Sequence, residues 1–129
     1  MKKQISLGLM LICLISCDNE VDKPKCGCRS EEISNISDNQ PLIGQLIVND
    51  ETSFFDQYEY VLIYQESNCT NCIHFIYACN ESEIVNQLIV GDSPVDIEFS
   101  GNLKMVCSRP FGPADYTYNL ISNLIIQEL

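Results

Sequence analysis

The chain has 129 residues, a formal net charge of −11 and 46% hydrophobic residues. This length is enough for one small domain and too short for two. The sequence contains 7 basic against 18 acidic residues. Because contacts to phosphates need lysine and arginine, this balance excludes nucleic acid as a partner.

The first residues have the pattern of an export signal. Lys2 and Lys3 precede an uncharged apolar run from Ile5 to Ile15, and a small residue, Ser16, follows. A positive start, an apolar run of roughly 7–15 residues and a small residue before the cleavage site are typical of secretory signals. The run is too short for a transmembrane helix, which needs about 20 residues.

The sequence Leu14-Ile15-Ser16-Cys17 resembles the lipobox of bacterial lipoproteins. This resemblance implies that residues 1–16 are a signal peptide and that the sulfur of Cys17 receives a diacylglyceryl group. It also implies a fatty acid such as palmitate on the new amino group. Two or more acyl chains hold a protein stably on a membrane. The membrane is therefore the first predicted partner, reached through this covalent lipid.

An acidic cluster, Asp18, Glu20 and Asp22, follows Cys17. It resembles the surface-export signal of lipoproteins from the Bacteroidota, whereas in enteric bacteria an Asp directly after the Cys resembles an inner-membrane retention signal. We expect an exported protein anchored in the bacterial cell envelope, with the outer membrane or cell surface favoured over the inner membrane. Cleavage leaves 5 basic and 18 acidic residues, a formal charge of −13. This charge disfavours electrostatic adhesion to anionic lipid.

Residues 17–40 are predicted to be a flexible acidic tether, because polar residues dominate and Ile33 and Ile36 are isolated. The exception is Cys26-Gly27-Cys28, which would tie the tether to another part of the chain. A single β-rich domain is predicted over residues 41–129.

The first half of this domain predicts three strands. Leu42–Val48 is apolar and β-branched, and Gly44 indicates a bulge or bend within it. Tyr58–Gln65 is aromatic and β-branched, and Cys72–Cys79 follows after a turn. In Cys72–Cys79, odd-numbered and even-numbered residues are expected on opposite faces.

The second half predicts one helix and two strands. Asn80 and Glu83 have the spacing of a capping box, and an apolar face follows, which predicts a helix over Glu81–Val90. The predicted strands are Val95–Ser100, continued after a bend at Gly101-Asn102 by Leu103–Cys107, and Tyr116–Glu128. The apolar spacing in Tyr116–Glu128 would also suit a helix, but its aromatic and β-branched residues favour a strand. The domain is therefore mostly β with one helix. This element order matches the OB-fold, a five-stranded barrel with its helix between strands three and four, or a small β-sandwich.

Six cysteines remain after Cys17, and an even number in a short exported chain indicates a disulfide framework. Six cysteines allow fifteen pairings. Our hypothesis joins Cys79 to Cys107, and joins the pair Cys26 and Cys28 to the pair Cys69 and Cys72.

Cys69-Thr70-Asn71-Cys72 has the spacing of redox-active C-x-x-C motifs. In thioredoxin-type enzymes the first Cys begins a helix, which lowers its pKa. Here the motif lies in a predicted turn, and Glu66 would raise the pKa of the thiol. A structural disulfide, within the motif or to outside cysteines, is favoured, and a thiol–disulfide redox protein is the alternative function.

Zinc is disfavoured. Cys26, Cys28, Cys69 and Cys72, with His74 nearby, could supply ligands. The C-x-C spacing is less usual than C-x₂₋₄-C in structural zinc sites, and an oxidising compartment favours disulfides. We expect no metal and no cofactor apart from the lipid.

No catalytic motif stands out, since the chain has no Gly-rich phosphate loop, Ser-His-Asp set or HExxH. The sequence predicts a non-catalytic binding or structural module whose partner is another envelope protein or a small ligand. OB-like barrels often bind across strands two and three, so the predicted binding surface is Tyr58, Tyr60, Tyr64 and His74. Cys26-Gly27-Cys28 and Phe99–Lys104 leading into Cys107 also resemble small uncharacterised lipoproteins of the Bacteroidota, a resemblance that implies no activity.

Overall fold

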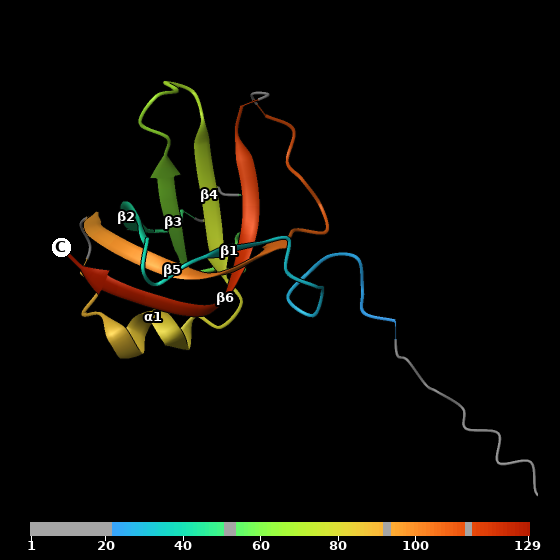
Figure 1. The fold of residues 1–129 in the computed structure, drawn as a ribbon, viewed down its shortest axis with the longest axis horizontal. Helices are drawn as coiled ribbons and strands as arrows, with labels where there is room; N and C mark the ends of the chain where they lie inside the picture. Colours follow the sequence, from blue (N-terminus) through green and yellow to red (C-terminus); the bar gives the residue numbers. More distant parts are fainter. Residues whose placement is uncertain (1–21, 51–53, 92–93, 113–114) are drawn as a thin grey trace, which may run out of the picture.

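The computed structural model describes residues 22–50, 54–91, 94–112 and 115–129. Figure 1 shows one layered β-barrel with a short helix beneath it. The elements are β1 (Ser34–Ile36), β2 (Leu42–Val48), β3 (Tyr60–Gln65), β4 (Ile73–Ala78), α1 (Ser82–Gln87), β5 (Val95–Met105) and β6 (Thr117–Glu128). Among the described helices, none is long and apolar enough to cross a membrane.

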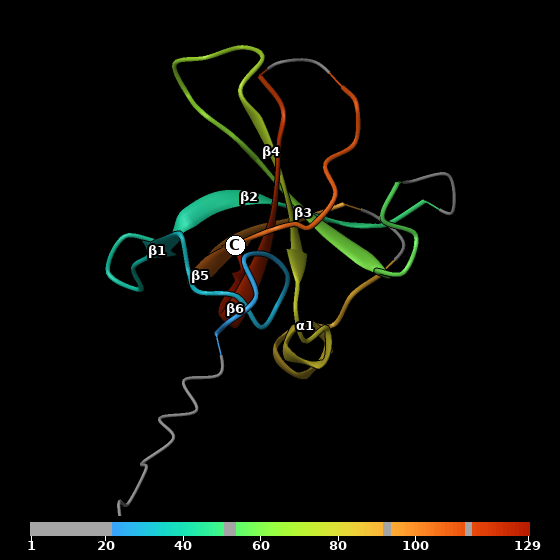
Figure 2. The same ribbon diagram turned by 90° about the vertical axis from the view of Figure 1, so that its right-hand side faces the viewer.

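Five strands close into a barrel. Strands β2, β3 and β4 are antiparallel neighbours, β4 pairs with β6 in parallel, and β5 pairs with both β6 and β2. The helix α1 lies between β4 and β5, at the opposite end of the barrel from the loops that join β3 to β4 and β5 to β6 (Figures 1 and 2). This order is that of the OB-fold, so the predicted OB-like barrel is confirmed.

Strand β2 has the predicted bounds, but the predicted bulge at Gly44 is wrong. The register with β5 is regular through this residue, which pairs with Ile97, and the register with β3 is regular from Gln45 onward. A Cβ at position 44 would lie 2.4 Å from the carbonyl oxygen of Ile63. Glycine is needed here because the backbone of β3 approaches closely.

Strand β5 is continuous through the predicted bend. The register with β6 shifts between Ser100 and Asn102, as in a β-bulge, and Gly101 has φ of 150°. A bulge increases the local bending of a strand, which lets one long strand pair with different neighbours along its length. The last element is a strand, as its aromatic and β-branched residues favoured, and it pairs with both β4 and β5.

The helix is shorter than predicted. It ends at Gln87 because Leu88 is extended, with φ of −130° and ψ of 149°. The predicted capping box does not form, because Glu81 is the N-cap residue and Asn80 Oδ1 accepts the backbone N–H of Ser82 at 3.2 Å.

Two hydrophobic clusters cover the two faces of β3 and β4. The interior cluster includes Leu62 and Ile76, and Ile84 of α1 closes one end of it. The outer cluster includes Val61 and Tyr77. The predicted alternation along β4 is therefore confirmed, and each face has its own core.

The segment predicted as the end of a tether is part of the domain. Strand β1 pairs with Gly101–Leu103, on the edge of β5 that β2 uses farther along. Gly27 N–H donates to the carbonyl of Met105 at 2.7 Å, and Ile33 N–H donates to that of Leu103 at 2.8 Å. The predicted boundary at residue 41 is therefore wrong, because the unpaired edge of β5 offers hydrogen bonds that this segment completes.

Candidate functional site

All six cysteines downstream of Cys17 form disulfides, but the pairing hypothesis is wrong. The bonds are Cys26–Cys107, Cys28–Cys79 and Cys69–Cys72. Cys69 and Cys72 precede β4, whereas Cys79 follows it, and a six-residue strand spans roughly 20 Å. The segment that holds Cys26 and Cys28 runs alongside β5 and is bonded to Cys79. These two cysteines therefore lie at the Cys79 end of β4 and cannot reach Cys69 and Cys72.

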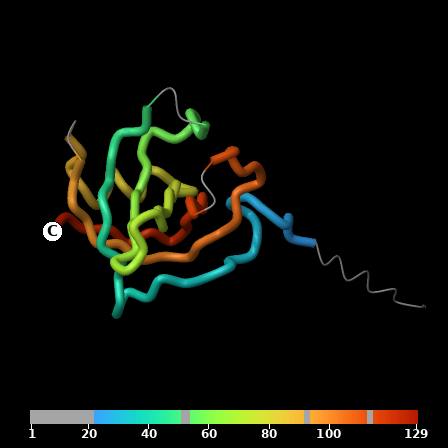
Figure 3. The backbone as a smooth tube through the Cα atoms, turned by 90° about the horizontal axis from the view of Figure 1, so that it is seen from above, coloured from blue at the N-terminus to red at the C-terminus, as the bar shows by residue number. Residues whose placement is uncertain are grey.

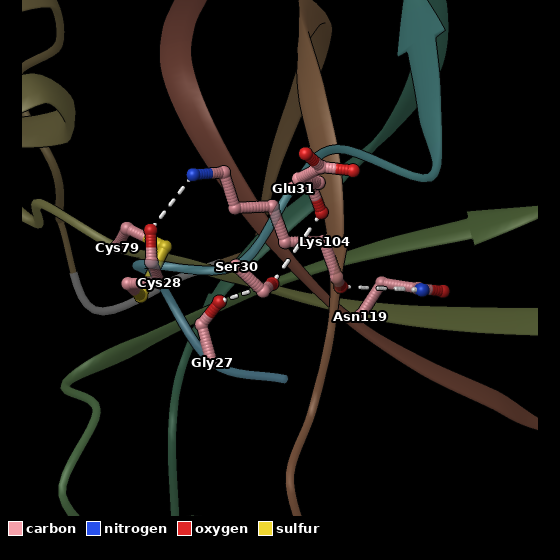
Figure 4. The surroundings of a disulfide bond; sticks show 7 residues. All are labelled: Gly27, Cys28, Ser30, Glu31, Cys79, Lys104 and Asn119. Carbon is pink, nitrogen blue, oxygen red and sulfur yellow. Dashed lines mark hydrogen bonds between the residues drawn. A yellow bond between two sulfur atoms is a disulfide. The ribbon is translucent and has the colours of Figure 1, made fainter. Parts of the chain in front are cut away.

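The Cys28–Cys79 bond lies in a small polar network (Figure 4). Lys104 Nζ donates to the carbonyl of Cys28 at 2.7 Å, and Ser30 Oγ donates to the carbonyl of Gly27 at 2.6 Å. Ser30 is buried. These contacts fasten the N-terminal segment to the barrel in addition to the covalent bonds.

The structure divides the predicted binding surface of four residues. Tyr60 lies in the interior cluster and is 8% exposed, whereas Tyr58 precedes β3 and packs in the outer cluster. Tyr64 and His74 are brought together at the end of the barrel opposite α1. The prediction that the four form one surface is therefore wrong. The physical reason is that Tyr58 precedes β3, so its side chain does not follow the alternation of the strand and lies on the other side from Tyr60.

His74 joins three elements at this open end. Its Nδ1 is hydrogen bonded to Thr117 Oγ1 of β6, and its Nε2 lies 2.8 Å from Glu66 Oε1. Tyr64 stacks on the imidazole with ring centroids 5.3 Å apart. His74, Glu66 and Tyr64 border a pocket of about 150 Å³ whose apolar wall includes Leu42 and Leu103. With both ring nitrogens occupied, the imidazole holds the end of the barrel together.

A larger cluster of aromatic rings packs on the outer side of β3 and β4, where Phe55 and Tyr77 are buried and the other rings are half-buried. Phe75 and Tyr118 are stacked with centroids 5.2 Å apart, and Tyr58 lies 5.1 Å from Tyr77. We define the aromatic face as the six connected rings Phe55, Tyr58, Phe75, Tyr77, Tyr116 and Tyr118. Offset and tilted ring contacts of this kind stabilise a cluster beyond its buried area.

A cavity of about 440 Å³ adjoins the aromatic face. It lies between the β2–β3 loop, which supplies Phe54 and Tyr58, and the chain after β5, which supplies Ser108. Phe54 is 59% exposed. In OB-folds, ligands bind on strands two and three between these same two loops, and those strands correspond to β3 and β4 here.

Two tyrosines have altered acidity. Burial, with the charge of Glu81 adding to it, raises the pKa of Tyr58 above its usual 10.0. Burial, followed by the charge of Glu59 and a hydrogen bond to it, raises the pKa of Tyr60. The environment of both tyrosines therefore favours the neutral hydroxyl over the phenolate.

The four cysteines that a zinc site would use are all in disulfides. In the part of the chain that the structure describes, no group of three or more His, Cys, Asp and Glu side chains could hold a metal ion. Since Cys72 is bonded to Cys69, it cannot form a nucleophilic dyad with His74 in this state.

No family model and no curated protein matches this chain. The sequence reasoning found Tyr58 but missed the rest of the aromatic face. A partial signal was present, because Phe75 and Tyr77 alternate with the inward-facing Ile76. Tyr118 joins them only because β6 pairs with β4.

Proposed function

We propose that this protein is a lipid-anchored, non-catalytic binding module of the bacterial cell envelope. Its ligand is received by the aromatic face and the adjoining cavity. The observation that carries the proposal is that a connected set of aromatic rings and a cavity of about 440 Å³ coincide at the position where OB-folds bind ligands.

The disulfides support the proposal that the protein is exported from the cytoplasm. Six cysteines follow Cys17, and all six form disulfides. Disulfides persist in oxidising compartments outside the cytoplasm. This agrees with export directed by a signal that ends at the lipobox Leu14–Cys17.

The chemistry of the site supports an uncharged ligand. No lysine or arginine lines the described cavity, so it lacks the cations that phosphate groups need. Aromatic rings pack well against the C–H faces of sugars, and OB-folds include binders of oligosaccharides. An envelope oligosaccharide is therefore the ligand class that we favour over a charged one.

Binding to oligosaccharides tests the site. We would measure the mobility of the mature protein in gels that contain soluble bacterial polysaccharides, tested one at a time. Retardation by at least one, reversed by Phe54→Ala and by Tyr58→Ala, supports the proposal. Ile43→Ala is the matched control, since Ile43 is 63% exposed on β2 and is not part of the aromatic face. Retardation that survives both aromatic substitutions would place the ligand elsewhere.

Lipidation is tested separately by the intact mass of the protein from bacterial membranes. We expect a chain that begins at Cys17 and carries diacylglyceryl and acyl groups. Cys17→Ala should leave the signal peptide uncleaved at this site. A membrane protein without acyl mass would contradict the anchor.

Thiol–disulfide exchange is the second candidate, because Cys69 and Cys72 are bonded to each other as in an oxidised C-x-x-C motif. Two sulfurs would accept two electrons from a partner dithiol, which would become a disulfide. Selective alkylation of Cys69 after mild reduction, with reoxidation by a disulfide partner, would support this function. A Cys69 that stays unreactive until the chain unfolds would exclude it.

A further inference from the structure

After Cys17, the lysines and arginines are confined to two short segments. Downstream of Cys17 the chain has five basic residues, three within residues 23–29 and two within residues 104–109. They are Lys23, Lys25, Arg29, Lys104 and Arg109. These segments are distant in the sequence, so their relation depends on the fold.

The fold brings the two segments together. The disulfide Cys26–Cys107 joins them, and Gly27 N–H donates to the carbonyl of Met105. Figure 3 shows the N-terminal segment in blue beside the chain that leaves β5 in orange. We call this surface, defined by the five basic residues, the basic end.

The basic end is accessible. Lys23, Lys25, Arg29 and Arg109 are exposed, and Lys104 is half-buried. Among the described residues, the one close contact of this kind is that of His74 with Glu66, so no lysine or arginine is paired with a described acid. Three acids, Asp22, Glu31 and Glu32, border the surface and offset part of its charge.

The opposite side of the barrel is acidic. It is formed by α1, the start of β5 and the end of β6 (Figure 1). These elements and the N-cap of α1 carry no basic residue and five acids, which are Glu81, Glu83, Asp96, Glu98 and Glu128. Although its net charge is strongly negative, the protein therefore has a basic end and an acidic opposite side.

The short distance between Cys17 and the barrel determines which end of the protein would lie nearest the membrane. Cys26, where the chain is bonded to the barrel, lies nine positions after Cys17. A chain of that length spans at most about 30 Å when fully extended. A lipid on Cys17 would therefore hold the basic end closest to the bilayer.

We propose that the basic end docks on the phosphate headgroups of anionic lipids in the membrane that holds the anchor, with the acidic side directed away. This inference rests on the proposed lipid anchor. The net charge alone disfavours adhesion, but a surface potential acts on each charge according to its distance and decays within about 10 Å. When the basic end touches the bilayer, its basic residues lie within that range, whereas the distant acids are screened. Asp18 and Glu20, beside the anchor, make the docking weak and dependent on salt.

Lysine acetylation tests the orientation, because Lys23, Lys25 and Lys104 are the lysines downstream of Cys17. The lipidated protein would be placed in vesicles of phosphatidylcholine, or of phosphatidylcholine mixed with phosphatidylglycerol. We expect acetylation of Lys23 and Lys25 to be about fivefold slower in the anionic vesicles at low salt. High salt should restore the rate.

Two variants sharpen the result. Replacing Arg29 and Arg109 by Glu should remove the protection, whereas Glu83→Gln on the acidic side should keep it. The intact mass, read from the same sample, reports the acyl groups. A lipidated protein whose lysines react equally in both vesicles overturns the docking and leaves the anchor intact. A protein without acyl mass overturns the anchor itself and the docking that rests on it.

Discussion

The carboxylate of Glu81 accepts the backbone N–H of Tyr60 at 3.0 Å and so joins the start of α1 to the start of β3. The same carboxylate accepts the N–H of Glu59 at 2.9 Å. We predict that Glu81→Ala lowers the free energy of unfolding by about 1–2 kcal/mol, because two backbone donors lose their acceptor. Urea denaturation followed by circular dichroism measures this change.

Glu83→Ala is the control for that substitution. Glu83 is half-buried on α1, as Glu81 is, and has the same charge. We expect a change within about 0.5 kcal/mol, as for most surface substitutions. Equal losses from the two variants would show that charge, and not the hydrogen bonds of Glu81, sets the stability.

The three disulfides should differ in their contribution to stability. The cysteines are 81 residues apart in Cys26–Cys107, 51 in Cys28–Cys79 and 3 in Cys69–Cys72. The chain-entropy model gives about 4 kcal/mol for each long loop and about 2 kcal/mol for the short one. Replacing both cysteines of one bond by Ala, followed by thermal denaturation, measures each. A larger loss from the Cys69–Cys72 variant than from the other two would contradict this ranking.

Gly101 should not tolerate a side chain. Its φ of 150° is rare for other residues, and a Cβ would lie 2.9 Å from the Ile121 side chain and the carbonyl oxygen of Ser122. We predict that Gly101→Ala destabilises the fold by about 1–3 kcal/mol. Gly91→Ala is the matched control, because no atom lies within 4 Å of its added Cβ. Calorimetric unfolding of the two variants separates them, and an unchanged Tm for Gly101→Ala would refute the contact.

Stability should fall at high pH. Burial, supported by nearby carboxylates, raises the pKa of Tyr58 and Tyr60 in the folded state above the unfolded value of 10.0. Their contribution is therefore fully present below about pH 10 and is lost as the pH rises through the folded pKa. Replacing both residues by Phe should make the fall between about pH 9 and pH 11 shallower. Urea midpoints across that range test this, and an identical fall in the double variant would contradict it.

Much of the fold could be predicted, because strands are specified by local patterns. The run Leu42–Val48 and the alternation along β4 depend on residues that are neighbours in sequence. Gly44 shows the limit, since its need for glycine comes from the carbonyl of Ile63 on another strand. The end of α1 was also misplaced, because the pattern does not show where Leu88 leaves the helix.

The candidate site was predictable only in part. Tyr58 was found from its position beside the second predicted strand, but Phe75 and Tyr118 form one stack through the parallel pairing of β4 and β6. Tyr60 was assigned to the surface although it faces the interior. The sequence pattern cannot show which face of β3 is interior, because a hydrophobic cluster packs on each of its two faces.

By itself, the sequence determined the order of the five barrel strands, the side to which β4 residues point, and the presence of six cysteines available for disulfides. These properties follow from local periodicity and composition. Only the tertiary structure decided which cysteines pair, that residues 26–36 belong to the barrel, and that the basic residues gather at one end. The physical reason is that each of these depends on segments far apart in sequence lying along the same strand, β5. The hydrogen bonds and disulfides that hold them there leave no periodic signal in the sequence.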